Sequence, residues 1–596
     1  MTVDRSAAAR AVVAAAAIVA AAAPFACTSD RDAFATGGDR FPDASIDDSG
    51  CQGGLRCSRD LRAVVDACDE SRVVTECPAD QGCADAKCVP ACNVTASSGA
   101  SVGCEFAALP PARFREGAGS CFAAFVANTW AAPARIEAEY DGAPLDLTRS
   151  GRIVQMSGDA ITYAPFDGEL EPGQVAVLFL GQAEGPDPST NTPEFWVPCP
   201  TGMTPAVLAD TSIRRTGRGS SFRIKTSLPV SAYSIYPFGG ASSFTPSATL
   251  LLPIPAWNTG YVVADAWAAA STAGNPSTQI VAAEDDTEVT IAPSVPIQPG
   301  YDVEGANKGE PHTYRLKRGE AIQFAQKEQL VGSLISANKN VAVFGGHECM
   351  NIPTEMYFAC DGEQLQLFPV RSWGHEYVAV PHRSRRVSGQ PEDYFYRVVA
   401  AADGTELTYE PDRPTGAPPT LARGGSVVFS TRDPFVVKSQ DDAHPFAVYA
   451  YMSSEMFAQA HLDDGDPEFT FVVPPDQYLD RYVFFVDPSF RNSHIVIVRA
   501  RPEGKEFEPV ELDCAGPLEG WQPVGTSGKY EFVRVALTDG FVGQRVGTKT
   551  CGAGRRELQS RGPFAVTVWG TDSAASYAYP GGSAIRTLND LEPITR

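Results

Sequence analysis

The sequence predicts an all-β protein of about four tandem β-sandwich-like repeats packed together, preceded by a small disulfide-rich module. Three observations lead to this prediction. Short apolar runs that alternate with polar residues recur along the 596 residues, as in strands with one buried face. The 53 glycines and 47 prolines are spread evenly, which indicates many tight turns. Eight of the cysteines fall between Cys51 and Cys104, where large apolar residues are scarce.

The segment from Ile280 to Cys349 shows the repeating unit most plainly. Its strands are IVAAEDDTEVTI, which turns at an acidic triplet, then YRLKRGEAIQF, and finally GSLISANKNVAVFGGH. Comparable runs recur four times, each ending in an aromatic strand near Gly or Pro. Units of roughly 80 to 120 residues with short alternating strands suit two sheets packed face to face. The alternative is a propeller-like arrangement of sheets, because copies of one unit can also close radially.

Two similar Pro-rich segments, LLLPIPAW at Leu250 to Trp257 and FVVPPDQY at Phe471 to Tyr478, lead directly into the next repeat. We expect them to be stiff joints. The expected divisions are a signal peptide at 1–26, a lipid-anchor cysteine and flexible tether at 27–50, the disulfide-rich module at 51–104, and a β region at 105–590 with repeats at about 110–250, 256–350, 370–455 and 478–585.

The N-terminal segment is typical of an export signal. Arg5 and Arg10 precede an apolar run from Ala11 to Phe25, which is too short to span a bilayer comfortably. Cys27 follows a small residue, as at a bacterial lipoprotein cleavage site, and we expect it to carry the lipid. Ordinary signal cleavage near Ala26 is the alternative. No later segment has 18 consecutive apolar residues, so we expect the membrane to be reached through the lipid anchor only.

Cysteine usage agrees with export. Of 15 cysteines, Cys27 is the odd one, and the other 14 suit seven disulfides. Zinc is the competing interpretation of the dense cluster before residue 105. However, no Cys-x2-Cys pair occurs there, and no histidine precedes His312. Disulfides are therefore favoured, although the spacing does not give their connectivity.

The charge balance restricts the partners. A formal net charge of −24 argues against nucleic acid, since such binding depends on Lys and Arg neutralising phosphates. We expect no cofactor and no metal. Calcium at the acidic loops Glu284 to Asp286 and Asp463 to Glu468 is the alternative, but neither loop has the order of a known calcium motif, and turn chemistry accounts for both.

No catalytic residues stand out. GRGS at Gly217 to Ser220 lacks the Gly-x-Ser-x-Gly pattern of a nucleophile elbow, and no neighbouring histidine supports a nucleophile. Paired carboxylates for glycoside hydrolysis stay open, because acidic residues are frequent and their separation in space is not visible in a sequence. We expect a protein that is not an enzyme.

One long segment carries a family resemblance. HECMNIPTEMYFACDGEQLQLFPVRSWGHEYV, with LVGSLISANKNVAVFGGH, EDDTEVTI and PFAVTVWGTDSAASYAYPGG, resembles the IgGFc-binding protein N-terminal domain over Ala107 to Thr587. That domain occurs in a secreted animal mucosal protein and in many bacterial exported proteins and lipoproteins. The Cys-rich segment before it is similar to that of the bacterial members. The resemblance implies a surface-displayed adhesive or recognition module, without indicating IgG as the ligand.

A few residues are candidates for the site. His347, Cys349, Cys360 and His375 could form a metal site, but in an oxidising compartment a disulfide between Cys349 and Cys360 is favoured, with His347 capping a strand end or packing against the loop. Trp257 and Trp373 lie in predicted loops, and His347 is near one, so these three are the ligand-binding candidates. Aromatics in the strands more simply fill the core.

The expected function is that of an exported, non-enzymatic adhesion protein, lipid-anchored at the cell envelope, that binds glycans, matrix or cell-surface proteins. A self-associating structural protein of the envelope or matrix is the second hypothesis. A carbohydrate-active enzyme is the third, and it requires two carboxylates about 5 to 10 Å apart in a cleft. The sequence does not indicate an oligomeric state.

Overall fold

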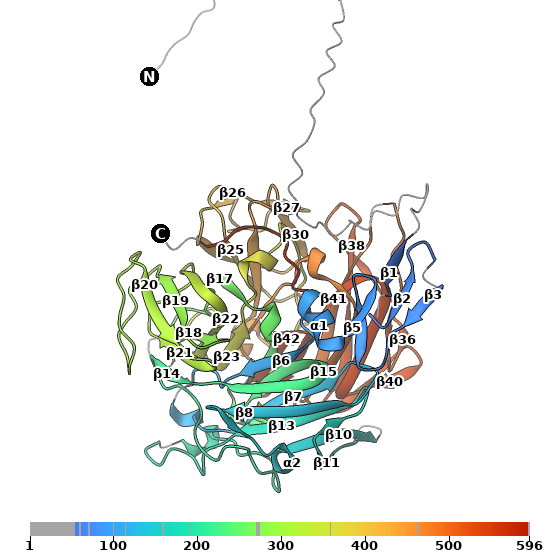
Figure 1. The fold of residues 1–596 in the computed structure, drawn as a ribbon. Helices are drawn as coiled ribbons and strands as arrows, with labels where there is room; N and C mark the ends of the chain where they lie inside the picture. Colours follow the sequence, from blue (N-terminus) through green and yellow to red (C-terminus); the bar gives the residue numbers. More distant parts are fainter. Residues whose placement is uncertain are drawn as a thin grey trace, which may run out of the picture. The chain divides into compact units, whose positions relative to one another are not determined.

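Four lobes of antiparallel β-sheet surround a common axis in the computed structural model (Figure 1). The structure describes residues 54–593 except 59–60, 70–71, 99, 114, 158–159, 191, 270–273, 358, 462–463 and 503. Gly53–Arg596 form one unit. Strands account for 48% of the residues and helices for 6%, which confirms the predicted all-β class. The predicted signal peptide, the lipid site at Cys27 and the tether lie outside the described residues.

The first two lobes each have one long strand among shorter ones. Lobe 1 (blue to cyan in Figure 1) holds β6 (Gly103–Ala108), β7 (Phe122–Asn128), β8 (Ala134–Tyr140), β9 (Ala143–Pro144), β10 (Gly151–Ser157), β11 (Ala160–Pro165), β12 (Glu169–Leu170), β13 (Val175–Gly181), β15 (Phe222–Tyr236), β16 (Ser247–Leu251) and the short helix α2 (Leu147–Ser150). Lobe 2 (green) holds β14 (Gly217–Ser220), β17 (Asn258–Val262), β18 (Pro276–Ala282), β19 (Thr287–Ala292), β20 (His312–Leu316), β21 (Glu320–Ala325), β22 (Leu334–Met350) and β23 (Asp361–Gln366).

The other two lobes follow the same plan. Lobe 3 holds β24 (Glu376–Ala379), β25 (Tyr394–Ala400), β26 (Thr405–Glu406), β27 (Thr408–Glu410), β28 (Thr420–Leu421), β29 (Ser426–Thr431), β30 (Phe435–Lys438), β31 (Phe446–Met452), β32 (Glu468–Phe471) and α3 (Glu455–Ala458). Lobe 4 (orange to red) holds β33 (Leu479–Val486), β34 (Asn492–Ala500), β35 (Val510–Leu512), β36 (Gly516–Pro517), β37 (Gln522–Val524), β38 (Tyr530–Asp539), β39 (Val542–Val546), β40 (Lys549–Cys551), β41 (Gly554–Asp572) and β42 (Ala575–Pro580).

Each lobe is sandwich-like because its long strand, or in lobe 3 a pair of strands, pairs with two different sets of strands. Residues 222–226 of β15 pair with β6 and β8, whereas residues 230–236 pair with β7 and β16. The strands β22 and β41 divide in the same way, and in lobe 3 the two halves are separate strands, β30 and β31. Pro229 and Pro563 lie at the divisions of β15 and β41, where a missing N–H ends the regular ladder. The predicted sandwich-like repeats are thereby confirmed.

A small module precedes the lobes and is held by disulfides. It contains β1 (Leu55–Cys57), β2 (Ala63–Asp66), β3 (Val73–Glu76), β4 (Gln81–Ala84), β5 (Lys87–Pro90) and α1 (Ala91–Ser98). Its bridges are Cys57–Cys83, Cys77–Cys88 and Cys92–Cys104, and Cys68 is also disulfide-bonded. The indole of Trp130 in lobe 1 donates to the Ala79 carbonyl at 3.0 Å and joins the module to the lobes. The disulfide-rich module is therefore confirmed.

A tyrosine recurs in the segment that enters lobes 2, 3 and 4. A 3-10 turn (Ile254–Ala256, Val370–Ser372 or Pro475–Gln477) comes first, and then Tyr261, Tyr377 or Tyr482. Each hydroxyl accepts from the N–H three residues before it and donates to a carbonyl of the same lobe. The joints are therefore held by identical buried hydrogen bonds. The sequence predicts two of these three joints but not the one at FPVRSW.

We predict that Tyr377→Phe lowers the free energy of unfolding by about 1 to 3 kcal/mol, because the Gly374 N–H and the Phe446 carbonyl lose their buried partner. The measurement is a urea unfolding curve with the disulfides intact. Tyr301→Phe, at a side chain that is 83% exposed, is the matched control and should leave the midpoint unchanged. Equal midpoints for both variants would contradict the structural role of the joint.

Candidate binding surface

Four inner strands, one from each lobe, line the common axis. β16 contacts β23, β23 contacts β32, β32 contacts β42, and β42 contacts β16. Their inner edges are hydrogen-bonded by side chains rather than by further strands. Ser247 and Thr249 of β16 accept from the N–H groups of Gln364 and Gln366 at 2.8 and 3.0 Å. Lobe 1 thus satisfies the inner edge of lobe 2, and the closed circuit of contacts among the four inner strands corresponds to the predicted propeller-like alternative.

Carboxylates accept hydrogen bonds from other backbone N–H groups near the axis. Asp361 accepts from the N–H of Ser576 at 2.7 Å, and Glu468 accepts from the N–H of Ala578 at 2.9 Å. Asp466 accepts from the N–H of Glu455 at 3.1 Å. These acids and Glu363 are at most 1% exposed. The axis is thus lined by buried acids that serve as backbone caps.

The acids on the axis have raised pKa values because they are buried. Burial raises the pKa of Glu468 from 4.5 to about 8, and burial together with the neighbouring Glu468 raises the pKa of Glu363 well above its ordinary value. Neither carboxyl oxygen of Glu363 has a hydrogen-bond partner among the described residues, so a charge on this group would be uncompensated. Both acids therefore favour the protonated form, and their burial keeps them out of reach of a substrate.

Four segments lead to the inner strands, from the long strand in lobes 1, 2 and 4 and from β31 in lobe 3. We name them the connectors: 237–246, 351–360, 453–467 and 573–574. Neighbouring connectors touch. The N–H of Ser454 donates to the Ile352 carbonyl at 3.0 Å, and the N–H of Gly465 donates to the Asp572 carbonyl at 2.8 Å. The connectors therefore gather at one end of the axis, and we name this end the connector face.

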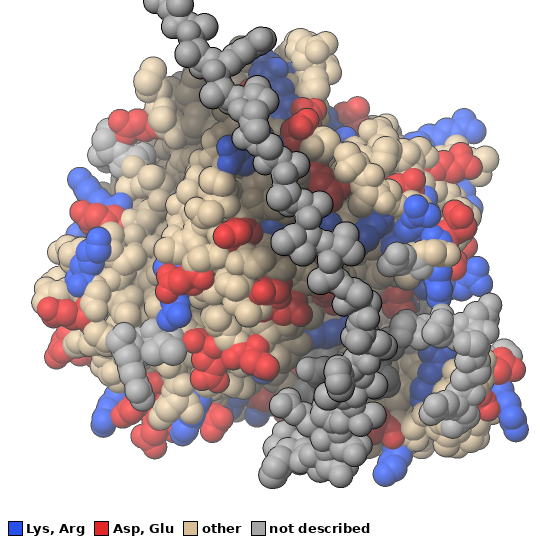
Figure 2. Space-filling view, turned by 90° about the horizontal axis from the view of Figure 1, so that it is seen from above, with Lys and Arg blue, Asp and Glu red and all other residues tan. Residues whose placement is uncertain are grey.

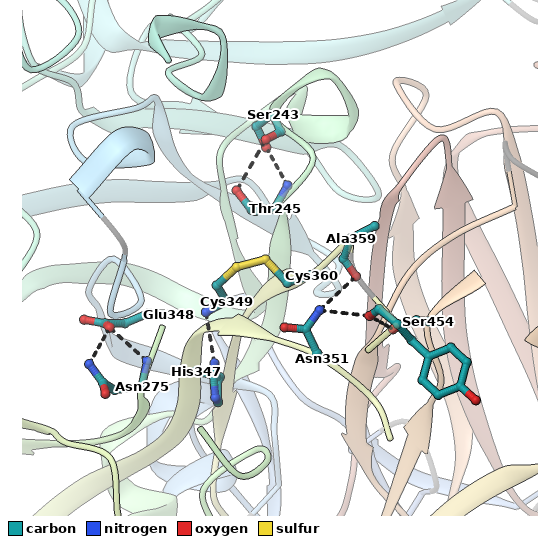
Figure 3. Close-up of a disulfide and its surroundings, with 11 residues drawn as sticks. Ser243, Thr245, Asn275, His347, Glu348, Cys349, Asn351, Ala359, Cys360 and Ser454 are labelled. Carbon is teal, nitrogen blue, oxygen red and sulfur yellow. Dashed lines mark hydrogen bonds between the residues drawn. A yellow bond between two sulfur atoms is a disulfide. The ribbon is translucent and has the colours of Figure 1, made fainter. Parts of the chain in front are cut away.

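The connector of lobe 2 is closed by a disulfide between Cys349 and Cys360 (Figure 3). Inside the loop, the Asn351 amide donates to the carbonyls of Tyr357 and Ala359 at 3.0 and 3.5 Å. The Ser454 hydroxyl of the next connector donates to the same Tyr357 carbonyl at 3.2 Å. The ring of Tyr357 lies 5.1 Å from that of Phe457. The loop is thus fixed both internally and against the neighbouring connector.

Large apolar side chains are exposed on the connector face. Three lie in connectors: Phe244 is 39% exposed, Met356 81% and Met456 44%. Val387 lies beside a connector, since its N–H donates to the Gln459 carbonyl at 3.1 Å. Phe541 is linked less directly: its N–H donates to the Arg491 carbonyl, and the Arg491 N–H donates to Asp572, the residue before the connector 573–574, each at 2.8 Å. Exposed apolar groups held on a rigid frame are what a protein-binding surface presents.

Charged groups are mixed elsewhere. Among the described residues of the face in Figure 2, acidic and basic side chains are interspersed. Ion pairs also occur at the protein surface, such as Arg432 with Asp393 at 2.8 Å. Exposed pairs of this kind contribute little to stability, and they keep the surface soluble.

Two of the predicted ligand residues are structural instead. Trp257 and Trp373 are each 1% exposed, which contradicts their assignment to ligand-binding loops. Their indoles donate to the carbonyls of Leu252 and Phe368, five residues earlier, at 2.9 and 3.0 Å. Each ring therefore closes a 3-10 joint. A loop position was a poor indicator of exposure, because both rings are buried in the core although they lie outside the strands.

His347 is also buried, at 0% exposed, so it does not contact a ligand from outside. Its Nδ1 accepts from the Cys349 N–H at 2.9 Å, and burial lowers the pKa of His347 to about 3. The neutral ring therefore caps the backbone next to the disulfide, as in the other role considered for it. His375 instead pairs with Asp442 at 2.5 Å on another lobe.

The acidic loops have different surroundings. At Glu284 to Asp286, the Thr287 hydroxyl donates to the Glu284 carbonyl and the Arg318 N–H donates to Asp285, as in an ordinary turn. At the second loop, Asp466 and Glu468 belong to the axis, which the sequence did not indicate. Within the described part of the chain, no group of three or more His, Cys, Asp and Glu side chains is arranged to hold a metal ion.

The apolar residues of the connector face were not identified from the sequence. Phe244, Met356 and Met456 each lie in a different connector, and a single apolar residue in a loop is a weak signal. They are the eighth, sixth and fourth residues of their connectors, so aligning the repeats does not place them in equivalent positions either. No signal in the sequence therefore groups these three residues.

The comparisons agree with this description. Residues 247–570 match a family described as IgGFc binding protein. This family is one of binding domains rather than of enzymes. The match covers more than half of the chain, and the chain belongs to this family, as its sequence led us to expect. A comparison with curated proteins found no match.

The disulfides bear on the compartment. Besides those of the N-terminal module and the connector, Cys121–Cys199 and Cys514–Cys551 are bridged. No helix within the described ranges is both long and apolar enough to cross a bilayer. A domain with so many disulfides fits an extracellular or secreted protein.

We predict that stability falls as the pH rises from about 4.5 to about 8. Over this range the unfolded chain releases protons that Glu363 and Glu468 retain when folded, so the free energy of unfolding should drop on the order of 1 kcal/mol per pH unit. Urea midpoints across this range measure it. Glu363→Gln should flatten the decline, and Glu519→Gln on the surface should not. A midpoint that rises with pH in the unmodified chain would refute this account.

Removing the connector disulfide should act locally. For the double variant Cys349→Ser and Cys360→Ser, we expect a loss of about 2 to 4 kcal/mol in stability and faster hydrogen exchange across 351–360, because the loop is freed. Cys514→Ser with Cys551→Ser is the control, which should lower stability without changing exchange in 351–360. The same exchange pattern in both double variants would show that the disulfide does not order the connector.

Proposed function

We propose that this protein is an exported, non-enzymatic recognition protein, anchored at the cell surface through Cys27, that binds a surface or matrix macromolecule through the connector face. The observation that carries the proposal is the exposure of Phe244, Met356 and Met456 on adjacent connectors. Membership of a family of binding domains supports it. The closed ring supports it as well, since a rigid frame lowers the ordering cost of binding.

The kind of partner follows from the chemistry of the face. Flexible, polarisable methionines and an aromatic ring adapt to apolar anchors on a protein better than to hydroxyl-rich sugars. We therefore favour a protein of the surface or matrix over a glycan for this face. A second copy of the chain could also supply such anchors, which is the structural alternative.

The test compares variants of the full-length chain for binding to extracellular matrix from the producing cells, to intact cells, and to an immunoglobulin Fc fragment as a defined protein. Calcium and a chelator are compared in parallel. The triple variant Phe244→Ser, Met356→Ser and Met456→Ser should lose about tenfold or more in affinity for the bound partner. The matched control changes Leu55, Val73 and Val74, which are 51%, 50% and 48% exposed on the N-terminal module, and should bind normally.

The remaining outcomes decide between the alternatives. Binding that both triple variants retain would contradict the connector face as the site. Sedimentation that shows concentration-dependent self-association, abolished by the connector variant and with no foreign partner, would favour the structural role. Turnover of a glycan by the unmodified chain would refute the non-enzymatic role.

A further inference from the structure

A cleft of about 940 Å³ lies where lobe 1 meets lobe 2, beside the closed connector. Its walls come from segments far apart in the sequence. Arg113 and Arg215 lie on the lobe 1 side, Gln326 and Lys327 follow β21, and Asn275 and Glu348 flank the disulfide loop. Strand ends from two lobes therefore form one concave site next to the connector face.

Nearly all the side chains that line the cleft end in a polar group, although their aliphatic parts also contribute to its walls. Apart from Ala118 and Ala325, every side chain on the walls carries an amide, a hydroxyl or a charge. Sites for apolar ligands or peptide anchors are lined mainly by hydrophobic groups. The Gln326 amide is buried, donates to the Pro296 and Glu328 carbonyls and accepts from the Gln298 N–H, so it fixes the wall. The amides of Asn275 and Gln298 match a ligand dense in hydroxyl groups, as an oligosaccharide is.

Some of the charged side chains on the walls are bonded to neighbouring residues, and others are not ion-paired. Asp187 pairs with Arg214 at 3.1 Å, and Glu348 accepts two hydrogen bonds from Asn275, each 2.9 Å long. Arg215 and Lys327 are exposed, and neither has an ion-pair partner in the part of the chain that the structure describes. Glu328 and Glu348 are the acidic side chains of the described lining that partly offset them, and Glu348 lies close enough to Arg215 for the two charges to interact. The cleft thus presents cationic groups in a chain of net charge −24.

Arg113 fixes the inner wall. It is 5% exposed, its guanidinium donates to the Tyr236 carbonyl at 3.1 Å, and it lies 4.7 Å from the Tyr236 ring. Its Nε and Nη1 atoms are buried without a hydrogen-bond partner among the described residues. A side-chain Cβ at Gly362 would lie 1.8 Å from Nη1, so the glycine leaves room for this cation. The positive wall is therefore built into the core.

We propose that this cleft binds an acidic glycan, with Arg215 and Lys327 on the carboxylate or sulfate groups and the amides of Asn275 and Gln298 on the hydroxyls. This site is separate from the apolar connector face. It would allow the protein to hold a charged polysaccharide and a protein partner at the same end of the ring.

The test is calorimetric titration of the full-length chain with a hexasaccharide of galacturonic acid. We expect saturable binding that weakens as salt is added, and about tenfold weaker binding by the double variant Arg215→Gln and Lys327→Gln. The methyl-esterified hexasaccharide, which lacks the charges, should bind about tenfold more weakly as well. A sulfated neutral hexasaccharide shows whether sulfate serves in place of carboxylate.

The matched control is Arg315→Gln with Lys317→Gln, which changes the net charge equally. Lys317 precedes β21 and Lys327 follows it, so the control lies at the opposite end of that strand. It should leave binding unchanged, as should the triple variant of the connector face. Absence of binding to either acidic hexasaccharide, equal weakening in both double variants, or tighter binding of hexaglutamate peptide would overturn the proposal.

Discussion

The fold depends on how the inner edge of each lobe is hydrogen-bonded. The inner strands have no further strand beside them at the axis, and water does not reach their buried N–H groups. Side chains of neighbouring lobes take this place, with Ser247 and Thr249 capping β23 and Asp361 and Glu468 capping β42. Because each of these caps comes from another lobe, lobes 2 and 4 do not complete their inner-edge hydrogen bonds alone.

This constraint explains the buried acids. A carboxylate reaches an N–H that a hydroxyl is too short to reach, but burying it is costly unless it is protonated or paired. Glu363 and Glu468 meet this condition because burial raises the pKa of each and favours the protonated form, and Arg113 lies near Asp361 and Glu363. The same Arg113 forms the inner wall of the polar cleft. The axis and the proposed glycan site are thus joined through one buried cation.

The ring also determines where binding surfaces occur. Each lobe turns from its long strand to its inner strand at the same end of the axis, so the connectors meet there whatever their sequences. Tyr261, Tyr377 and Tyr482 hold the joints. The connectors are therefore free to vary, and in this chain they present apolar side chains on one face and flank a cationic cleft.

Much of the fold could be predicted from the sequence, because alternation, turns and cysteine spacing are local signals. The four-fold repetition, the disulfide-rich module and the Cys349–Cys360 bridge could all be predicted from such signals. The burial of Trp257, Trp373 and His347 could not be predicted from the sequence, because burial depends on how the lobes pack together. For the same reason the sequence showed Asp466 and Glu468 as turn residues, although they line the axis.

The closed ring is tested most directly by residue-level hydrogen exchange of the unmodified chain. If the caps exist, the amides of Gln364, Gln366, Ser576 and Ala578 should exchange as slowly as those of the central strand β18, whereas the outer edge strand β20 should exchange faster. Inner-strand amides that exchange as fast as those of β20 would show an open edge at the axis and would contradict this account.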